Sequence, residues 1–398
     1  MDEWIDAGTA AERLGVKPAT LYAYVSRGVL RRRRGDDGRR SLFSLAEVEE
    51  LARRGRPRNQ PPELVIESRV TTLGVDRPYY RGIDALELAR TAAFESVAEW
   101  LWTGEPARGP SLGWAGDPEG VRAAIAAQRA LPDGLLPIDR LQVSTTVLGA
   151  TDSLRYQLDP ASVAATGRRL IAGLIDSLPF AADPPIAQGE GQGGVAGRLW
   201  ARLCPAPPTP AQLAALQAAL VLLADHELAA STLAARVAAS AKADPYAVVL
   251  TGLGVLGGPL HGGASYDAER LLAEVTDPGR AARVIADRVR RGERIPGYGH
   301  SVYKNGDARG AFLMDLVEAA APGHERLEAI RAVTTEVRRR RLPEPNIDFA
   351  LAGLTAVSGT IPGSGEAIFA VARIAGWLAH AMEEYAKGTL LRLRATPR

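Results

Sequence analysis

Residues 257–264 read GGPLHGGA, which places His261 among four glycines and one proline. Glycine lets other groups approach the backbone closely and adopts dihedral angles that other residues avoid. The segment therefore has two interpretations: a tight turn with an incidental histidine, or a histidine presented to a ligand. Because glycine clusters mark loops in most proteins, the rest of the chain has to decide between them.

Histidine is scarce in this chain and recurs in polar segments that interrupt apolar ones. The 398 residues contain five histidines. His226 lies in ADHELAAST, within a long run of helical pattern, and His300 lies in IPGYGHSVYKNGDARG. Asp348 follows a proline-bracketed loop in LPEPNIDFALAGL. These segments and GPLHGGA together form the candidate site.

Composition narrows the class of protein. Hydrophobic residues make up 46% of the chain and charged residues 24%, as in globular proteins. The net charge of +2 gives no global basic field, and the single cysteine, Cys204, excludes an intramolecular disulfide and a cysteine-rich metal site. The N-terminus is acidic, and the apolar runs are too short to span a membrane. We expect a cytoplasmic protein with no membrane segment and no bound metal.

The first 55 residues differ from the rest. TAAERLGV and KPATLYAYVSRG predict two helices, the second with Pro18 in its first turn and Gly28 past its end. RRRRGDDGRR and SLFS predict a hairpin, and Ser44 with Glu47 three positions later predicts a capping box that opens a third helix. Over residues 4–53 this order resembles the winged helix-turn-helix head of MerR-type regulators.

Residues 55–63, GRPRNQPPE, are polar and proline-rich and predict a linker. The following segment, ELVIESRVTTLGVDRPYYRG, alternates enough to predict a small β-hairpin. Beyond it the apolar spacing predicts helices almost throughout, including one or two buried helices in PAQLAALQAALVLLADHELAASTLAARVAAS.

Three motifs follow one another along the chain: GPLHGGA, PGYGHSVYKNGDAR and PNIDF. In this order they resemble the motifs of the citrate synthase family over residues 63–394. The resemblance implies a mainly α citrate synthase fold behind the winged helix-turn-helix head, working as a homodimer. It implies these domain boundaries: a head over 1–54, a linker over 55–63, a large domain over 64–263 and 360–398, and a small domain over 264–359.

The resemblance also implies a Claisen condensation of an acyl-CoA with oxaloacetate, giving citrate or 2-methylcitrate. The residue types suit that chemistry. A carboxylate in a dry pocket has a raised pKa and serves as a base, which fits Asp348. A neutral histidine donates to the oxygen of a developing enolate, which fits His261. His300 would polarise the acceptor ketone. No cofactor is expected, because the coenzyme A thioester is itself a substrate.

Arginine binds carboxylates through two parallel hydrogen bonds. By the resemblance, the oxaloacetate-binding residues are His226, Arg309, Arg373 and Arg392, with Arg392 reaching the partner's site in a dimer. Coenzyme A contacts would come from Lys304 and from the backbone of Pro296, Gly297, Tyr298 and Gly299.

Bland interpretations remain open for several of these residues. His226 could be a structural histidine of a helix with its hydrogen bonds satisfied. Asp348 could cap a helix after Pro345, and Arg392 could be a basic residue exposed to solvent. The chain also departs from the family, which often has asparagine at Ala229 and proline at Ala308. These departures leave the acyl donor open, since citrate and 2-methylcitrate synthases share the motifs.

The head leaves two interpretations. Arg31–Arg34, Arg39 and Arg40 would contact DNA phosphates from the wing, and Arg27 is the one strong reader of base edges on the second helix. Asp36 and Asp37 at the wing tip would instead repel phosphates, and the head then serves as a protein-docking module. The alternative function for the whole chain is a transcriptional regulator whose synthase-like body senses metabolites without turnover.

Overall fold

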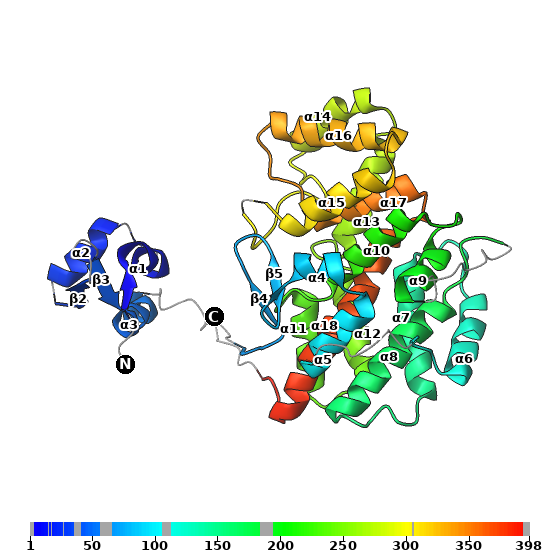
Figure 1. The fold of residues 1–398 in the computed structure, drawn as a ribbon, viewed down its shortest axis with the longest axis horizontal. Helices are drawn as coiled ribbons and strands as arrows, with labels where there is room; N and C mark the ends of the chain where they lie inside the picture. The colour runs from blue at the N-terminus through cyan, green and yellow to red at the C-terminus, as the bar shows by residue number, and fades with distance from the viewer. Residues whose placement is uncertain are drawn as a thin grey trace. The chain divides into compact units, whose positions relative to one another are not determined.

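The structure is a computed structural model that describes residues 4–14, 16, 18–26, 28–35, 41–55, 66–105, 113–183, 194–304 and 306–392 (Figure 1). The chain divides into two compact units, one of Met1–Ile66 with Arg394–Arg398 and one of Glu67–Leu393. Each unit has its own hydrophobic core, and each is described by itself below.

The N-terminal unit has the predicted order of helix, turn, helix, wing and helix. Its elements are β1 (Trp4–Asp6), α1 (Ala7–Leu14), α2 (Pro18–Ser26), β2 (Arg32–Arg34), β3 (Ser41–Ser44) and α3 (Leu45–Gly55). The strands form an antiparallel sheet in the order β1-β3-β2. Leu21, Leu30, Phe43 and Val48 fill the core between sheet and helices. Arg27 and the wing residues 36–40 lie outside the described residues.

The predicted capping box at the start of α3 is wrong. Ser44 ends β3, and its buried hydroxyl has no hydrogen-bond partner among the described residues. The Glu47 carboxylate instead accepts from the backbone N–H of Arg31 at 2.6 Å and pairs with the Arg31 guanidinium. Glu47 therefore ties α3 to the start of the wing, because this tertiary contact takes the carboxylate that a capping box needs.

The second unit begins with the predicted hairpin. Strands β4 (Thr71–Leu73), β5 (Pro78–Tyr80) and β6 (Ile83–Asp84) form an antiparallel sheet. Tyr80 is fully buried, and its hydroxyl donates to the carbonyls of Val221 and Leu222 at 3.0 and 3.1 Å. These hydrogen bonds fix the sheet to the residues just before position 224.

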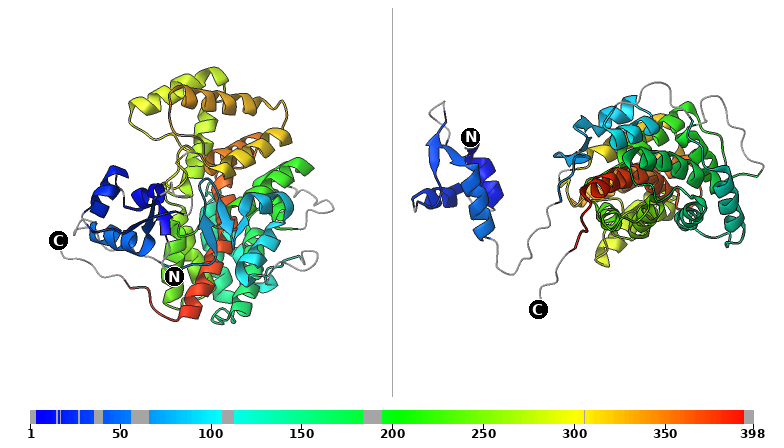
Figure 2. Two further views of the ribbon diagram at one scale, coloured as in Figure 1. Left: turned by 60° about the vertical axis from the view of Figure 1, so that its left-hand side comes forward. Right: turned by 90° about the horizontal axis from the view of Figure 1, so that it is seen from below.

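Helices make up nearly all the rest of this unit (Figure 2). Their bounds are α4 (Ala85–Thr91), α5 (Phe94–Thr103), α6 (Pro118–Arg129), α7 (Pro137–Thr151), α8 (Pro160–Ser177), α9 (Val195–Leu203), α10 (Pro210–Leu223), α11 (Ala230–Ser240), α12 (Pro245–Leu256), α13 (Gly263–Glu274), the short 3₁₀ helix η1 (Pro278–Arg280), α14 (Ala281–Arg290), α15 (Ala308–Ala320), α16 (Glu325–Arg339), α17 (Ile347–Ser358) and α18 (Ser364–Lys387).

Several of these helices begin with proline after a capping side chain. Asp117, Asp159, Thr209 and Asp244 each accept a hydrogen bond from a backbone N–H of the first turn, and a proline follows each of them. Proline is favoured there because its fixed φ suits the helix and its missing N–H leaves no donor unsatisfied.

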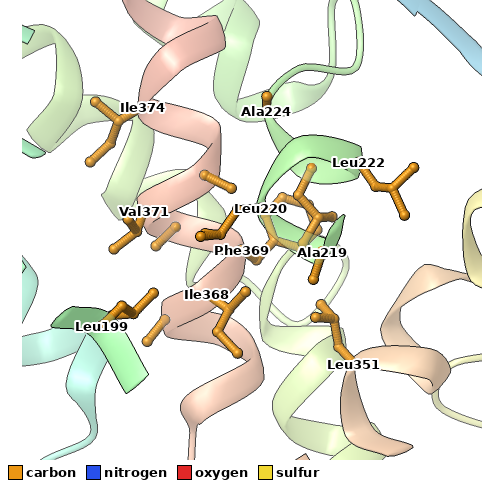
Figure 3. Close-up of a cluster of buried hydrophobic side chains, with 14 of the residues drawn as sticks. Leu199, Ala219, Leu220, Leu222, Ala224, Leu351, Ile368, Phe369, Val371 and Ile374 are labelled. Carbon is orange, nitrogen blue, oxygen red and sulfur yellow. The ribbon is translucent and has the colours of Figure 1, made fainter. Parts of the chain in front are cut away.

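Helix α18 runs through the centre of this unit and is buried on all sides (Figure 3). Ile368, Val371 and Ile374 pack among side chains such as Leu199 and Leu220 from neighbouring helices. A helix that is apolar all round belongs in a core, yet α18 also carries the polar side chains of Arg373, Trp377 and His380 into that core.

The sequence predicted one or two buried helices in the long apolar run over residues 210–240, and the structure has two. The sequence pattern placed His226 within a helix, and this is wrong, because residues 224–229 form the turn between α10 and α11. The backbone of Glu227 has φ +52°, a left-handed conformation that ends a right-handed helix.

We predict that Gly252→Ala destabilises the protein by about 1–3 kcal/mol, the usual cost of overpacking a core. A methyl group at Gly252 would lie 2.6 Å from the Trp377 ring. Gly254→Ala on the same helix is the matched control. Nothing lies within 4 Å of its added methyl group, so it should be neutral or stabilising by about 0.5–1 kcal/mol. Urea denaturation of both variants checks this, and equal effects would contradict the packing argument.

Candidate active site

Five separate elements carry the predicted site residues to the interior of the second unit. His226 lies in the turn after α10, and His261 lies in the turn between α12 and α13. His300 precedes α15, Asp348 lies in the first turn of α17, and Arg373 lies in the middle of α18. The contacts described below connect them.

His226 and His300 lie edge to face, with ring centroids 5.2 Å apart. Tyr303, which the sequence analysis did not single out, stacks on His300 at 4.6 Å and places its hydroxyl 3.1 Å from Nε2 of His226. Burial, together with the charges of Arg309 and Arg373, holds the pKa of His226 well below its ordinary value. His226 is therefore neutral at physiological pH. It is not a structural histidine within a helix, which was the alternative interpretation.

The hydrogen bonds of His300 determine which ring nitrogen carries its proton. The backbone N–H groups of Val302 and Tyr303 both donate to Nδ1 of His300, at 3.0 and 3.1 Å. Burial and the charge of Arg309 lower the pKa of His300 to about 4, so the ring is neutral. Its proton then sits on Nε2, which is free to donate to a ligand oxygen.

Arg309 is 2% exposed and forms a two-pronged ion pair with Asp307, at 2.9 and 2.8 Å. The same carboxylate accepts from the backbone N–H of Ile347 at 3.2 Å. Asp307 thus holds Arg309 in place and joins the start of α15 to the start of α17. The guanidinium also lies 5.4 Å from the Tyr303 ring, within the His226 cluster.

Arg373 is 1% exposed and lacks a carboxylate partner among the described residues. Its Nε donates to the carbonyl of Leu223 at 2.8 Å, while one terminal nitrogen, NH1, is buried with no hydrogen-bond partner in the described chain. Burial lowers its pKa to about 10, so it remains charged. A buried charge with an unsatisfied donor is costly, which points to an anionic ligand.

The Nε2 of His261 lies 2.6 Å from the Ser231 hydroxyl, which itself accepts from the indole N–H of Trp377 at 3.2 Å. The Ser231 hydroxyl has one proton to donate. When Nε2 accepts it, the proton of the neutral ring sits on Nδ1, the tautomer opposite to that of His300. Burial and then Arg373 lower the pKa of His261 to about 4. Neither Ser231 nor Trp377 was identified from the sequence.

The glycines around His261 do not all serve a ligand, as the sequence interpretation had assumed. Leu256 occupies the space that a side chain at Gly262 would need, and the carbonyls of Gly257 and Gly258 do so at Gly263. The second glycine pair of GGPLHGGA is therefore explained by a tight turn. Room for a ligand beside Gly257 and Gly258 stays a prediction.

Asp348 lies beside the turn that carries His261. Its carboxylate accepts a hydrogen bond from Ser265, in the first turn of α13. Asn346, not Asp348, caps α17, since its side chain accepts from the backbone N–H groups of Asp348 and Phe349. Burial raises the pKa of Asp348 to about 6, and the hydrogen bond from Ser265 opposes this rise. The carboxylate is thus free for chemistry near neutral pH.

The predicted coenzyme A segment, Pro296–Gly299, is bound to the strand-like stretch before α17. Asn346 donates its backbone N–H to Gly297 O at 2.9 Å, and Gly299 donates to Glu344 O at 2.8 Å. Gly297 and Gly299 have φ of +78° and +81°, which only glycine adopts readily. The side chain of Lys304 is exposed, and its Nζ donates to the carbonyl of His300 at 3.4 Å.

Arg392 lies beyond α18 and is exposed. Among the described residues Arg392 forms no hydrogen bond or ion pair, so no such contact connects it to the site of its own chain. No three metal-ligating side chains gather in the described parts of the chain. Nor does any described helix have the length and apolar character needed to cross a membrane.

A half-buried carboxylate of raised pKa, neutral histidines and two buried arginines suit proton abstraction beside an anionic substrate. The model of the citrate synthase C-terminal domain matches residues 63–394, and that of a helix-turn-helix domain matches residues 4–56. The chain therefore belongs to the citrate synthase family, and it is an acyltransferase enzyme of that type.

Relatives of two names match most of the chain. It is 30% identical to citrate synthase 2 of Bacillus subtilis, over 82% of this chain and 92% of that protein. It is 32% identical to 2-methylcitrate synthase of Mycobacterium tuberculosis, over 79% of this chain and 82% of that protein.

Solved structures share the fold. The citrate synthase of Thermotoga maritima matches with a TM-score of 0.71 at 24% identity, covering 85% of this chain and 95% of that one. The citrate synthase of Thermoplasma acidophilum, in a ternary complex with carboxymethyl coenzyme A and oxaloacetate, matches with a TM-score of 0.70 at 23% identity. It covers 84% of this chain and 93% of that one.

We predict that Asp348→Asn raises the melting temperature at pH 8 and that this gain disappears toward pH 4. The folded protein binds a proton at Asp348 up to pH about 6, whereas the ordinary pKa is 3.8. The raised pKa stabilises the fold below pH 3.8, and that contribution is lost as the pH rises through 6. Asparagine carries no charge and escapes the loss.

Thermal denaturation from pH 4 to pH 8 measures this difference. Asp133→Asn, at an exposed position, is the control and should show no such trend. A difference between Asp348→Asn and wild type that does not vary with pH would contradict the raised pKa.

Proposed function

We propose that this enzyme condenses an acyl-CoA with oxaloacetate, giving citrate or 2-methylcitrate and free coenzyme A. The observation that carries the proposal is the buried, unsatisfied guanidinium nitrogen of Arg373. Its charge acts on the carboxylate of Asp348, whose pKa is about 6. A dicarboxylate acceptor supplies the missing anion, and a thioester supplies the acidic C–H bond.

In the first step Asp348 removes a proton from the carbon next to the thioester carbonyl. Charge develops on the carbonyl oxygen, and the Nδ1–H of His261 donates to it. Such a donor stabilises the transition state because it is already oriented by the protein. The hydrogen bond from Ser231 to Nε2 keeps His261 in the tautomer that this step requires.

In the second step the enolate carbon attacks the ketone carbon of oxaloacetate, and a carbon–carbon bond forms. The Nε2–H of His300 polarises the ketone oxygen. Arg309 and Arg373 bind the carboxylates of the acceptor, and His226 adds a further contact. Water then cleaves the thioester, so that the acid and the thiol of coenzyme A leave.

Lys304 and the backbone of Pro296–Gly299 would contact coenzyme A. The reaction as proposed uses no cofactor, since histidine N–H groups and guanidinium groups balance the developing negative charge. We place it in the cytoplasm. Relatives of both product names match the chain, so acetyl-CoA and propionyl-CoA are both candidate donors.

A DNA-binding regulator remains the alternative function, because the head has a helix-turn-helix fold. Its wing arginines are partly engaged with the head itself: Arg31 pairs with Glu47, and Arg33 lies 4.7 Å from the Trp4 ring. This favours a docking module over a phosphate-binding wing. Enzyme activity measured with and without a DNA library separates a DNA-binding head from a docking module.

We predict release of coenzyme A from acetyl-CoA or propionyl-CoA only when oxaloacetate is present, at a rate that a chelator does not change. Asp348→Ala should lower kcat by about 10²–10⁴-fold, the usual contribution of a positioned base. In wild type, kcat/KM should fall as the pH drops below about 6, because protonated Asp348 is no base. A thiol-release assay measures all three.

Asp133→Ala, which removes an exposed carboxylate, is the matched control and should keep wild-type kcat. Release that needs no oxaloacetate, or near-normal turnover by Asp348→Ala, would contradict the assignment of the base.

We further propose a homodimer in which Arg392 completes the acceptor site of the partner. Arg392→Ala should then weaken the use of oxaloacetate, and mixing Arg392→Ala subunits with Asp348→Ala subunits should restore part of the activity. One site of the mixed dimer has both residues intact. If subunit exchange is confirmed and the mixture is no more active than the separate variants, Arg392 does not act across subunits.

A further inference from the structure

The turn that carries His226 is held in an unfavourable backbone conformation. Glu227, the next residue, has φ +52° although it is not a glycine. Such residues persist where surrounding contacts fix them, and they gather at functional sites. The contacts that fix this turn come from α18 and from β5.

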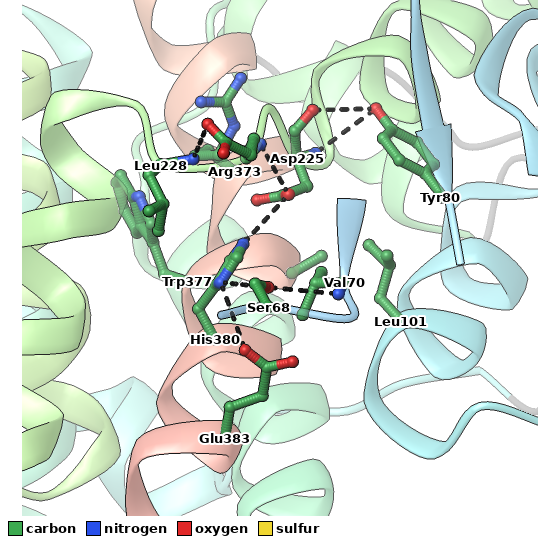
Figure 4. Close-up of polar contacts among 12 residues, drawn as sticks. Ser68, Val70, Tyr80, Leu101, Asp225, Leu228, Arg373, Trp377, His380 and Glu383 are labelled. Carbon is green, nitrogen blue, oxygen red and sulfur yellow. Dashed lines mark hydrogen bonds and ion pairs between the residues drawn. The ribbon is translucent and has the colours of Figure 1, made fainter. Parts of the chain in front are cut away.

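Asp225 makes the contact inside the turn. Its Oδ2 accepts from the backbone N–H of Glu227 at 3.1 Å and lies 3.2 Å from Nε2 of His380 (Figure 4). Both Asp225 and His380 are fully buried. Gly376 on α18 lets the carboxylate approach, because any side chain there would collide with Asp225, and its N–H donates to Ala224 O at 2.9 Å.

Arg236 determines how His380 meets Asp225. Its NH1 lies 2.7 Å from Nδ1 of His380. A guanidinium only donates hydrogen bonds, so Nδ1 accepts, and the proton of a neutral His380 sits on Nε2. That proton is donated to Asp225. Arg236 is itself fully buried and is held by ion pairs with Glu383 and Glu384.

This network is poorly explained by stability alone. Nε of Arg236 and Oε2 of Glu384 are buried without a hydrogen-bond partner among the described residues. Buried ion pairs are often no better for stability than apolar residues of the same volume. The unsatisfied atoms therefore argue that the network serves a purpose besides stability. Its contacts reach the turn of His226 through Asp225, and they reach residues 67–69 through Ser68 Oγ, the N–H of Arg69 and the carbonyl of Glu67.

We propose that His380 and Arg236 are positioning residues: they hold the Asp225–Glu227 turn so that His226 faces the acceptor. His380 touches no reacting atom and acts through Asp225. This inference rests on the proposed use of oxaloacetate, and it adds His380 of α18 and Arg236 of α11, to which the sequence analysis gave no role.

Two substitutions of His380 separate positioning from simple packing. His380→Gln keeps an N–H near the place of Nε2, within reach of Asp225. His380→Asn keeps a polar group facing Arg236 but is too short to reach Asp225. We expect His380→Asn to raise KM for oxaloacetate about tenfold, as for the loss of one hydrogen bond. KM for the acyl-CoA should stay within about twofold, and His380→Gln should restore most of the loss.

Amide hydrogen exchange over residues 224–229 gives a readout that needs no turnover. Exchange should rise in His380→Asn and remain near wild type in His380→Gln. If exchange behaves this way but wild type does not use oxaloacetate, the positioning role stands and the proposed function falls. If wild type is active and neither KM nor exchange differs between the two variants, the positioning role is overturned.

Tyr80→Phe keeps the inference testable if His380→Asn does not fold. It removes only the hydroxyl that bonds to the carbonyls at the end of α10 and to Asp225 O, at 3.2 Å, from the side opposite α18. The same rise in KM for oxaloacetate and in exchange over 224–229 is expected. Wild-type values for both would count against a positioned turn.

Discussion

Arg373 carries a positive charge in the core of the second unit, and no carboxylate among the described residues pairs directly with it. Removing a guanidinium from water is costly, and this one recovers only part of that cost through Leu223 O. The consequences spread through the site. The charge of Arg373 contributes to the lowered pKa values of His226 and His261, and it opposes the rise at Asp348. The proposed dicarboxylate acceptor would pair its negative charge with this guanidinium.

One face of α18 carries side chains that contact several parts of the site. Arg373, Trp377 and His380 follow one another at helical spacing, and each fixes a different part of the site. Trp377 bonds to Ser231, the partner of His261, while His380 reaches the turn of His226 through Asp225. A rigid, fully buried helix suits this purpose, because side chains locked by packing hold their partners within narrow limits. The polar groups lie in a core because they must reach several loops at once.

The sequence predicted more of the candidate site residues than of the residues that hold them in place. His261, His300 and Asp348 stand in short motifs with glycine or proline neighbours, and the structure places all three in turns or at a helix start. Ser231 sits in ordinary helical sequence, and Tyr303 lies within the motif of His300 without a chemical pattern of its own. Their roles arise only from contacts across the fold. The turn at residues 224–229 was missed because no glycine or proline interrupts the apolar pattern there. The capping box at Ser44 failed because Arg31, distant in the pattern, takes the Glu47 carboxylate.

Ala229 shows how a departure from the family pattern alters this balance. It is the N-cap residue of α11 and offers no side chain to the free N–H groups of the first turn. Replacing a polar cap by alanine typically costs about 1 kcal/mol, so the helix start contributes less to fixing the turn before it. What remains are the carboxylates of Asp225 and Glu227, which accept from the backbone N–H groups of Glu227 and Leu228. With the cap absent, the conformation of the turn depends more heavily on Asp225, and through it on the buried network of α18.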